Sequence, residues 1–345
     1  MKLPLKLNNE NDIYYNCKKP YSYNPYFLGI DGARGLGKTT TFLIDALKQC
    51  EKGKQFVYLR RYKPELKEFV TKDSLGPIID DIKYKGDGNG GYTFVYKDTI
   101  LGYGIPLIKQ RDYKSVDFSK VTRIIFDEAF VLETIAYRYL QKEVTLFWEM
   151  ISTITRTRKD YKIILIANNE DLFNPYYRFF NIPIFSKVFV DTKRGLYFEH
   201  GEPSEKLIAL EKQTPLYNMI KDTDYGSYHY GNKNISIDRK ISIIEKPSNT
   251  KLLFRLEINN KTLNCYSFAN IKGKLFMYIE FRDKYIDDTI TYHLVKDDMP
   301  NYYYVDLYKK KVKSYLSRMY YNDNSICCDN DNSATLIKWI ITSIK

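Results

Sequence analysis

The sequence predicts an α/β protein, in which a parallel sheet with flanking helices is followed by a linker and then by a smaller α+β domain. Strand-like and helix-like patterns alternate through the first 200 residues, and this alternation is typical of a parallel sheet covered on both faces. The composition becomes mixed after residue 200, and consecutive strand-like runs begin near residue 235. We therefore expect a first domain at 1–200, a linker or lid at 201–233 and a second domain at 234–345.

The first domain is expected to contain buried strands wherever a short apolar run lies between charged or glycine-rich segments. In chain order these runs are Tyr26–Ile30, Gln55–Arg60, Val121–Phe126 and Lys162–Ala167. Apolar residues at helical spacing predict helices at Lys38–Lys52 and Leu132–Thr155. Glycine-rich turns within residues 78–108 predict hairpins between the second and third strands.

The second domain is expected to consist mainly of consecutive strands, at Lys251–Ile258, Thr262–Phe268, Lys274–Phe281 and Ile290–Val295. Helices are expected near Val305–Tyr321 and Ser333–Ile344. On the first of these, helical spacing directs one apolar set toward the core: Tyr308, Val312, Tyr315, Leu316 and Met319. The same spacing leaves a basic set outward: Lys309, Lys310 and Lys313.

Composition limits the classes of function. The net charge of +12 and the pI near 9.1 favour an anionic partner, most commonly nucleic acid, although a basic surface also improves solubility. Apolar runs fall short of the roughly 20 residues that span a bilayer, and no signal segment opens the chain, so we expect a cytoplasmic protein. The five scattered cysteines and three histidines do not form a zinc-hydrolase pattern.

The pattern G-x-x-x-x-G-K-[ST] lies between the first strand and the first helix. Its residues are Gly32, Ala33, Arg34, Gly35, Leu36, Gly37, Lys38 and Thr39, with Thr40 next. The glycines allow backbone N–H groups to surround phosphate oxygens at a helix N-terminus. Lys38 would reach the β- and γ-phosphates of ATP, and the Thr39 hydroxyl would ligate Mg²⁺.

An acidic pair, Asp127 and Glu128, follows the apolar run of the third strand. Asp127 would bind the magnesium ion, and Glu128 would polarise the water that attacks ATP. The pair favours an ATP-hydrolysing motor. A small-molecule kinase would not need Glu128, and a protein that uses ATP only to order its DNA-binding surface stays a further alternative.

Three polar residues are candidates for roles around the γ-phosphate. Asn168 follows the next strand, where a γ-phosphate sensor is expected, although asparagine is also common in turns. Arg156 or Arg158 is expected to act in a neighbouring subunit's site, where such a residue contributes a factor of about 10³ to 10⁵ in rate. The alternative is a solvated charge at a helix end.

Four segments together resemble the DNA-packaging ATPases of phi-29-like bacteriophages, which are terminase-like P-loop ATPases of the additional-strand, catalytic-glutamate type. They are Gly32–Lys38, Tyr58–Leu66, Ile125–Glu128 and Asn174–Asn181. The resemblance covers most of residues 26–181 and is much weaker beyond. Thr39 stands where the best-known pattern has serine, which is a conservative change.

The resemblance implies a ring-shaped motor, most familiarly a pentamer, at the portal of a procapsid in the host-cell cytoplasm. ATP hydrolysis would drive viral double-stranded DNA inward, and a structural RNA is a further possible partner. The trans-acting arginine aligns best with Arg156, and a trans-acting lysine with Lys114. The C-terminal domain would resemble an RNase-H-type nuclease that has lost its activity. A helicase or a DNA-transfer motor is the alternative function.

A motor that moves any DNA sequence holds phosphates rather than reading bases. The candidate phosphate contacts are Arg60, Arg61, Lys63, Lys83 and Lys85, although such residues are also common on any solvated surface. In the C-terminal domain, Glu257 and Glu280 are expected on adjacent strands, where a working nuclease would place metal ligands. The wider aspartate-rich set is missing, so nuclease activity is expected to be absent.

Overall fold

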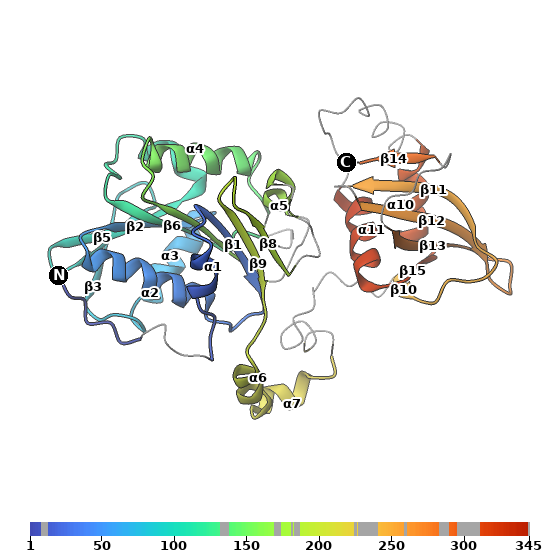
Figure 1. The fold of residues 1–345 in the computed structure, drawn as a ribbon, viewed down its shortest axis with the longest axis horizontal. Helices are drawn as coiled ribbons and strands as arrows, with labels where there is room; N and C mark the ends of the chain where they lie inside the picture. Colours follow the sequence, from blue (N-terminus) through green and yellow to red (C-terminus); the bar gives the residue numbers. More distant parts are fainter. Residues whose placement is uncertain are drawn as a thin grey trace. The chain divides into compact units, whose positions relative to one another are not determined.

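The computed structural model describes residues 1–7, 13–131, 138–168, 174–180, 182, 187–223, 226, 241–258, 261–282, 290–294 and 311–343. The chain divides into two compact units, Met1–Ile235 and Ser236–Lys345, and Figure 1 labels most of their elements. Among the described residues, no helix combines the length and the hydropathy that crossing a membrane requires.

The first unit is built on a nine-stranded sheet in the order β3-β4-β5-β2-β6-β7-β1-β9-β8. The strands from β5 to β9 in this order are parallel, and antiparallel strands close both edges. The strand bounds are β1 Phe27–Gly32, β2 Gln55–Arg60, β3 Ile82–Gly86, β4 Tyr92–Tyr96, β5 Thr99–Pro106, β6 Val121–Asp127, β7 Lys162–Ile166, β8 Val188–Asp191 and β9 Leu196–Gly201. The predicted α/β class and its four buried strands are confirmed, whereas β8 and β9 were not predicted.

Helices cover both faces of this sheet (Figure 1). The helices on the sheet are α1 Lys18–Ser22, α2 Lys38–Glu51, α3 Lys63–Thr71, the 3₁₀ helix η1 Leu107–Tyr113, α4 Glu143–Thr155 and α5 Pro175–Phe180. Two further helices, α6 Glu205–Lys212 and α7 Pro215–Ile220, follow β9 in the chain. The predicted start of α4 at Leu132 is wrong, because Lys142 has a left-handed backbone (φ 56°) immediately before Glu143. Residues 132–137 lie outside the described part of the chain. Helices α6 and α7 occupy much of the segment that the sequence suggested as a linker.

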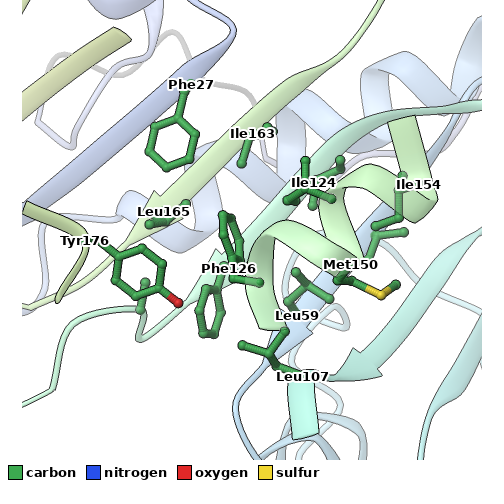
Figure 2. Close-up of a cluster of buried hydrophobic side chains, with 14 of the residues drawn as sticks. Phe27, Leu59, Leu107, Ile124, Phe126, Met150, Ile154, Ile163, Leu165 and Tyr176 are labelled. Carbon is green, nitrogen blue, oxygen red and sulfur yellow. The ribbon is translucent and has the colours of Figure 1, made fainter. Parts of the chain in front are cut away.

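Two apolar cores lie on opposite faces of the sheet, because successive side chains of a strand alternate between its faces. On β6, Ile124 and Phe126 belong to the core beneath α4, and Ile125 belongs to the core beneath α2 and α3. Figure 2 shows the first core, where Phe126 and Met150 lie between β6 and α4. Burial of each such side chain stabilises the fold by about 1.5–3 kcal/mol. This packing on both faces therefore fixes the carboxyl ends of the parallel strands side by side, at the end of the sheet where the strands terminate.

The second unit contains a six-stranded sheet in the order β10-β15-β13-β12-β11-β14. Its elements are β10 Ile241–Ile243, β11 Lys251–Ile258, β12 Lys261–Ala269, β13 Leu275–Arg282, β14 Thr291–His293, α10 Lys313–Tyr321, β15 Ile326–Cys328 and α11 Asp331–Ser343. The predicted strands and the final helix are confirmed, and the burial predicted around α10 holds for Val312, Leu316 and Met319. Tyr308, Lys309 and Lys310 lie outside the described residues.

Candidate active site

The loop between β1 and α2 is shaped by two glycines. Gly32 has φ +141°, and a Cβ atom there would lie 2.2 Å from the carbonyl oxygen of Gly201 on β9. Gly37 has φ +79° and is the N-cap of α2. A residue with a side chain would be strained at either position. The loop therefore turns tightly and presents the first N–H groups of α2, which is a favourable site for an anion.

Lys38 lies inside this loop, with only 5% of its surface exposed. Its Nζ donates hydrogen bonds to the carbonyl oxygens of Gly32 (2.9 Å) and Ala33 (2.7 Å). A buried ammonium needs such acceptors, and phosphate oxygens can take their place. The loop thus places a cation where the sequence predicts the β- and γ-phosphates.

Asp127 ends β6 beside this loop, since only β7 separates β6 from β1 in the sheet. The Thr39 hydroxyl donates a hydrogen bond to Asp127 Oδ1 at 3.1 Å. A hydroxyl and a carboxylate that face each other supply the oxygen ligands that Mg²⁺ prefers. The donor set therefore fits the predicted magnesium site.

Glu128 follows in a left-handed backbone conformation (φ +53°), which is uncommon for a residue with a side chain. Hydrogen bonds hold this turn: the Glu128 N–H donates to Asp127 Oδ1 (3.1 Å), and the Ala129 N–H donates to the Ile166 carbonyl on β7 (2.9 Å). Burial is the main reason why the pKa of Glu128 is raised, and it outweighs the opposite effect of Arg60. Glu128 is thus fixed beside the metal site and is more basic than an ordinary glutamate.

Arg60 and Arg61 are paired with acidic side chains and are largely buried, in contrast to the exposed positions expected of DNA contacts. Arg60 forms ion pairs with Asp127 Oδ2 (3.4 Å) and Glu128 Oε2 (2.9 Å), and only 12% of its side chain is exposed. Arg61 is 2% exposed, and its Nε and Nη2 donate to the two carboxylate oxygens of Glu143 (2.7 and 2.8 Å). Both guanidinium groups are committed inside the domain, so neither is available to a DNA phosphate.

A cavity of about 620 Å³ lies between the loop that follows β1 and the acidic pair at the end of β6. The loop residues Gly35–Thr41 line it together with Asp127, Glu128 and Asn168, so the sensor predicted at Asn168 faces the same space. Ile166 and Ala167, at the end of the predicted strand before Asn168, also line it. The other lining residues were not predicted: Leu7, Tyr14, Tyr15 and Ile44.

The N-terminal part of this wall is held on the loop by backbone contacts. The Tyr15 N–H donates to the Leu36 carbonyl, and the Thr41 hydroxyl donates to the Tyr15 carbonyl, both at 2.8 Å. Tyr14 would be 3.1 Å from a Cβ atom at Gly37. No local sequence signal marks Tyr14 and Tyr15, because only the folded chain brings them to the loop.

A comparison with protein families matches residues 9–335 to the podovirus DNA encapsidation protein (Gp16) family. The chain belongs to this family. The DNA packaging protein of Bacillus phage phi29 is 27% identical over 280 residues, which cover 79% of this chain and 80% of that protein. The DNA packaging protein of Bacillus phage B103 is 31% identical over 242 residues, which cover 68% and 72%. The resemblance found in the sequence is therefore confirmed.

Solved structures of this kind share the fold. The chain from the bacteriophage Phi-29 viral genome packaging motor assembly has a TM-score of 0.58 at 22% identity, over 97% of this chain and 100% of that one. The Phi-28 gp11 DNA packaging motor has a TM-score of 0.52 at 18% identity, over 98% of both chains. At these identities the likeness establishes the fold of this encapsidation protein.

The two arginines that follow α4 in this encapsidation protein differ in their surroundings. Arg158 donates to the Val121 carbonyl (2.6 Å) and the Ile154 carbonyl (3.0 Å), and it pairs with Asp160 (3.3 Å). Arg156 is the C-cap of α4 and is exposed, as is Lys114 after η1. The contacts of Arg158 lie within its own chain, which leaves Arg156 as the better candidate for a role in a neighbouring subunit.

Three predicted DNA contacts of this packaging protein lie at one edge of the sheet. Lys83 and Lys85 are exposed on one face of the edge strand β3. Lys63 begins α3, and its side chain lies against the β3–β4 turn, where a Cβ atom at Gly90 would be 2.6 Å from Lys63 Cδ. The three lysines therefore belong to one exposed corner of the first unit.

The C-terminal carboxylates do not form the expected arrangement. Strand β12 lies between β11, which carries Glu257, and β13, which carries Glu280, so the prediction of adjacent strands is wrong. Glu280 is buried and accepts hydrogen bonds from Tyr266 (2.7 Å) and Lys246 (3.1 Å). Within the described part of the chain, no group of three His, Cys, Asp or Glu residues could hold a metal.

Proposed function

We propose that this protein hydrolyses ATP with Mg²⁺ and uses the energy to move viral double-stranded DNA into a procapsid. Packaging of viral DNA follows from membership of the DNA encapsidation family, and it confirms the function expected from the sequence. The observation that carries the enzymatic part is the convergence of Lys38, Thr39, Asp127 and Glu128 on one cavity.

Each residue at this cavity has a distinct role in hydrolysis. Lys38 and the N–H groups of the loop hold the phosphates, and the bound magnesium ion neutralises charge that develops on them. Thr39 and Asp127 hold that ion. Glu128 accepts a proton from the attacking water, and Asn168 contacts the γ-phosphate.

The apolar wall of the cavity is proposed to receive the base of the nucleotide. The phosphates would be held at Lys38 and Thr39, and Leu7, Tyr14 and Ile44 line the same cavity, where the base could pack against them. Tyr14 is 47% exposed and presents an aromatic face. Stacking of a base on an aromatic side chain contributes about 1–3 kcal/mol.

Assembly would complete the site. Arg156 is exposed, and we propose that it enters the pocket of a neighbouring subunit in a ring. We expect a pentamer docked at the portal of the procapsid in the host cytoplasm, with double-stranded DNA at Lys63, Lys83 and Lys85. The C-terminal unit is proposed to contact nucleic acid or the portal without nuclease activity.

DNA packaging into purified procapsids tests this function. Wild-type protein with ATP and Mg²⁺ should protect linear DNA from added nuclease, and it should fail without ATP or without procapsids. A strand-displacement assay on the same preparation covers the alternative. Strand separation without procapsid-dependent protection would favour a helicase, whereas protection without strand separation supports the packaging motor.

A further inference from the structure

Tyr58 on β2 contacts the site from within the core. It is 1% exposed, and its hydroxyl donates a hydrogen bond to Asp127 Oδ2 at 2.7 Å. Its ring is stacked on Phe69 of α3, with ring centroids 4.2 Å apart and planes 29° apart. The hydroxyl therefore reaches the carboxylate from a ring whose position is fixed by packing.

The two oxygens of Asp127 have different partners. Oδ1 accepts from the Thr39 hydroxyl and the Glu128 N–H, both at 3.1 Å. Oδ2 accepts from Tyr58 and lies 3.4 Å from Arg60 Nη1. Rotation of the carboxylate would break the hydrogen bonds to both oxygens. The contacts of Oδ2 with Tyr58 and Arg60 therefore fix the direction of Oδ1.

We propose that Tyr58 is a positioning residue for magnesium: it holds Asp127 Oδ2 so that Oδ1 faces Thr39 and the metal. This inference rests on the proposed ATPase function of the site. Removal of the hydrogen-bond partner of a metal ligand typically lowers metal affinity 10- to 100-fold.

The hydrogen bond also connects the metal site to the segment that carries the candidate DNA contacts. Tyr58 and Arg60 lie on the same strand, and Phe69 belongs to the helix that begins at Lys63. A displacement of this strand or helix would therefore move a partner of Asp127. This connection is a physical contact of buried groups and involves no surface residue.

The variant Tyr58→Phe removes the hydroxyl and keeps the ring that stacks on Phe69. Binding of a fluorescent, slowly hydrolysed ATP analogue to the full chain should be titrated against Mg²⁺, with direct metal binding followed by electron paramagnetic resonance of Mn²⁺. We expect the metal concentration for half-maximal binding to rise 10- to 100-fold. Nucleotide binding in excess chelator should be unchanged, and the hydrolysis rate should recover at saturating Mg²⁺.

The matched control is Tyr21→Phe. The Tyr21 hydroxyl likewise donates to a carboxylate, Asp45 Oδ2 at 2.6 Å, but neither residue lines the cavity. This variant should keep the wild-type metal requirement.

Two results would overturn the inference. One is an unchanged metal requirement in Tyr58→Phe. The other is an equal loss of nucleotide affinity with and without metal, together with a lower melting temperature, which would show a role in folding only. If wild-type protein does not hydrolyse ATP in the presence of Mg²⁺, the proposed ATPase function fails, and that result is distinguishable from failure of the variant alone.

Discussion

Arg60 and Arg61 are neighbours in the chain and lie on opposite faces of the sheet. Arg60 ends β2, and Arg61 follows it directly. Arg60 points to the acidic pair, and Arg61 packs against Phe126 of the core beneath α4. Arg61 lies between the rings of Phe126 and Tyr139, 5.4 and 5.1 Å from their centroids. It also donates to the carbonyl oxygens of Glu128 (3.1 Å) and Ala129 (2.8 Å). Arg61 thereby holds the turn that carries the proposed catalytic glutamate.

Glu128→Gln should bind Mg-ATP with wild-type affinity and lose turnover, because an amide of the same shape cannot accept the proton of water. General-base catalysis contributes a factor of about 10² to 10⁴, so the expected loss is at least 100-fold. Steady-state phosphate release and nucleotide titration measure the two quantities. In contrast, Lys38→Ala should weaken binding itself. Hydrolysis at the wild-type rate by Glu128→Gln would remove this residue from the mechanism.

The pH dependence of hydrolysis should report the raised pKa of Glu128. A general base acts when deprotonated, so activity should fall as pH decreases through its pKa, at a higher pH than for an ordinary glutamate of pKa about 4.3. The Arg60 guanidinium lowers this pKa, and Arg60→Gln should therefore move the acidic limb of the rate profile to still higher pH. An acidic limb at the same pH in both proteins would contradict the pairing.

Arg61→Met should destabilise the fold, because it leaves the buried Glu143 carboxylate without its cation. Breaking a buried pair in this way costs about 3–5 kcal/mol. The double variant Arg61→Met/Glu143→Gln should recover most of the free energy of unfolding in urea, since the unpaired charge is gone. Hydrolysis should stay impaired in the double variant, because the Glu128 and Ala129 carbonyls have lost their donor. Equal stability of the single and double variants would show that charge burial is not the cause.

At the scale of elements, the β3–β4 hairpin and the start of α3 form the basic corner of the first unit. The loop between β3 and β4 is braced by Asp87, whose Oδ1 accepts from the Asn89 and Gly91 N–H groups, both at 2.9 Å. Tyr113 of η1 donates to the other oxygen of Asp87 at 2.7 Å. A braced hairpin holds Lys83 and Lys85 in fixed positions, which suits repeated contact with a DNA backbone.

If these lysines hold phosphates, affinity for duplex DNA should fall steeply with salt and should hardly depend on base sequence. Each phosphate contact contributes about −0.9 to the slope of log K against log[salt]. Lys63→Ala should flatten the slope by roughly one unit, and Lys83→Ala/Lys85→Ala by roughly two. Lys187→Ala is the control, since Lys187 precedes β8 at the other edge of the sheet. A slope that none of these changes affects would place the DNA contacts elsewhere.

At the scale of the whole molecule, we propose that the site is completed by a second chain. Arg156 is exposed at the end of α4, whereas the groups that bind phosphate and metal lie at the carboxyl edge of the sheet. An arginine supplied by a neighbour would make hydrolysis depend on assembly, so that each subunit acts only beside an intact partner. The exposed position of Arg156 and the internal contacts of Arg158 together favour this arrangement.

Arg156→Ala should bind ATP as a monomer and lose most hydrolysis under conditions that form the ring. Mixing it with Glu128→Gln should restore activity only at interfaces that combine an intact arginine with an intact pocket. Phosphate release across a series of mixing ratios measures this rescue. The absence of rescue at every ratio would indicate a site completed within one chain, and Arg158 would then be the residue to test.

The sequence by itself determined the features that depend on local backbone chemistry. The loop from Gly32 to Thr39 requires glycine where φ is positive, and the apolar run before Asp127 requires a strand buried on both faces. Both requirements concern residues that are close together in the chain, so they can be recognised as sequence motifs. The same logic placed Asn168 at the carboxyl end of the strand beside β6.

Only the tertiary structure decided which groups meet across long stretches of sequence. The partner of Arg61 is Glu143, the partner of Tyr58 is Asp127, and Tyr15 reaches the loop at Leu36. Strand β9, which no local pattern marked, pairs with β1 and explains why Gly32 has no room for a side chain. The physical reason is that strand order and face are set by burial of the whole sheet. The sequence alone therefore does not distinguish Arg60 from Arg61, whereas the fold directs Arg60 to the site and Arg61 to the core.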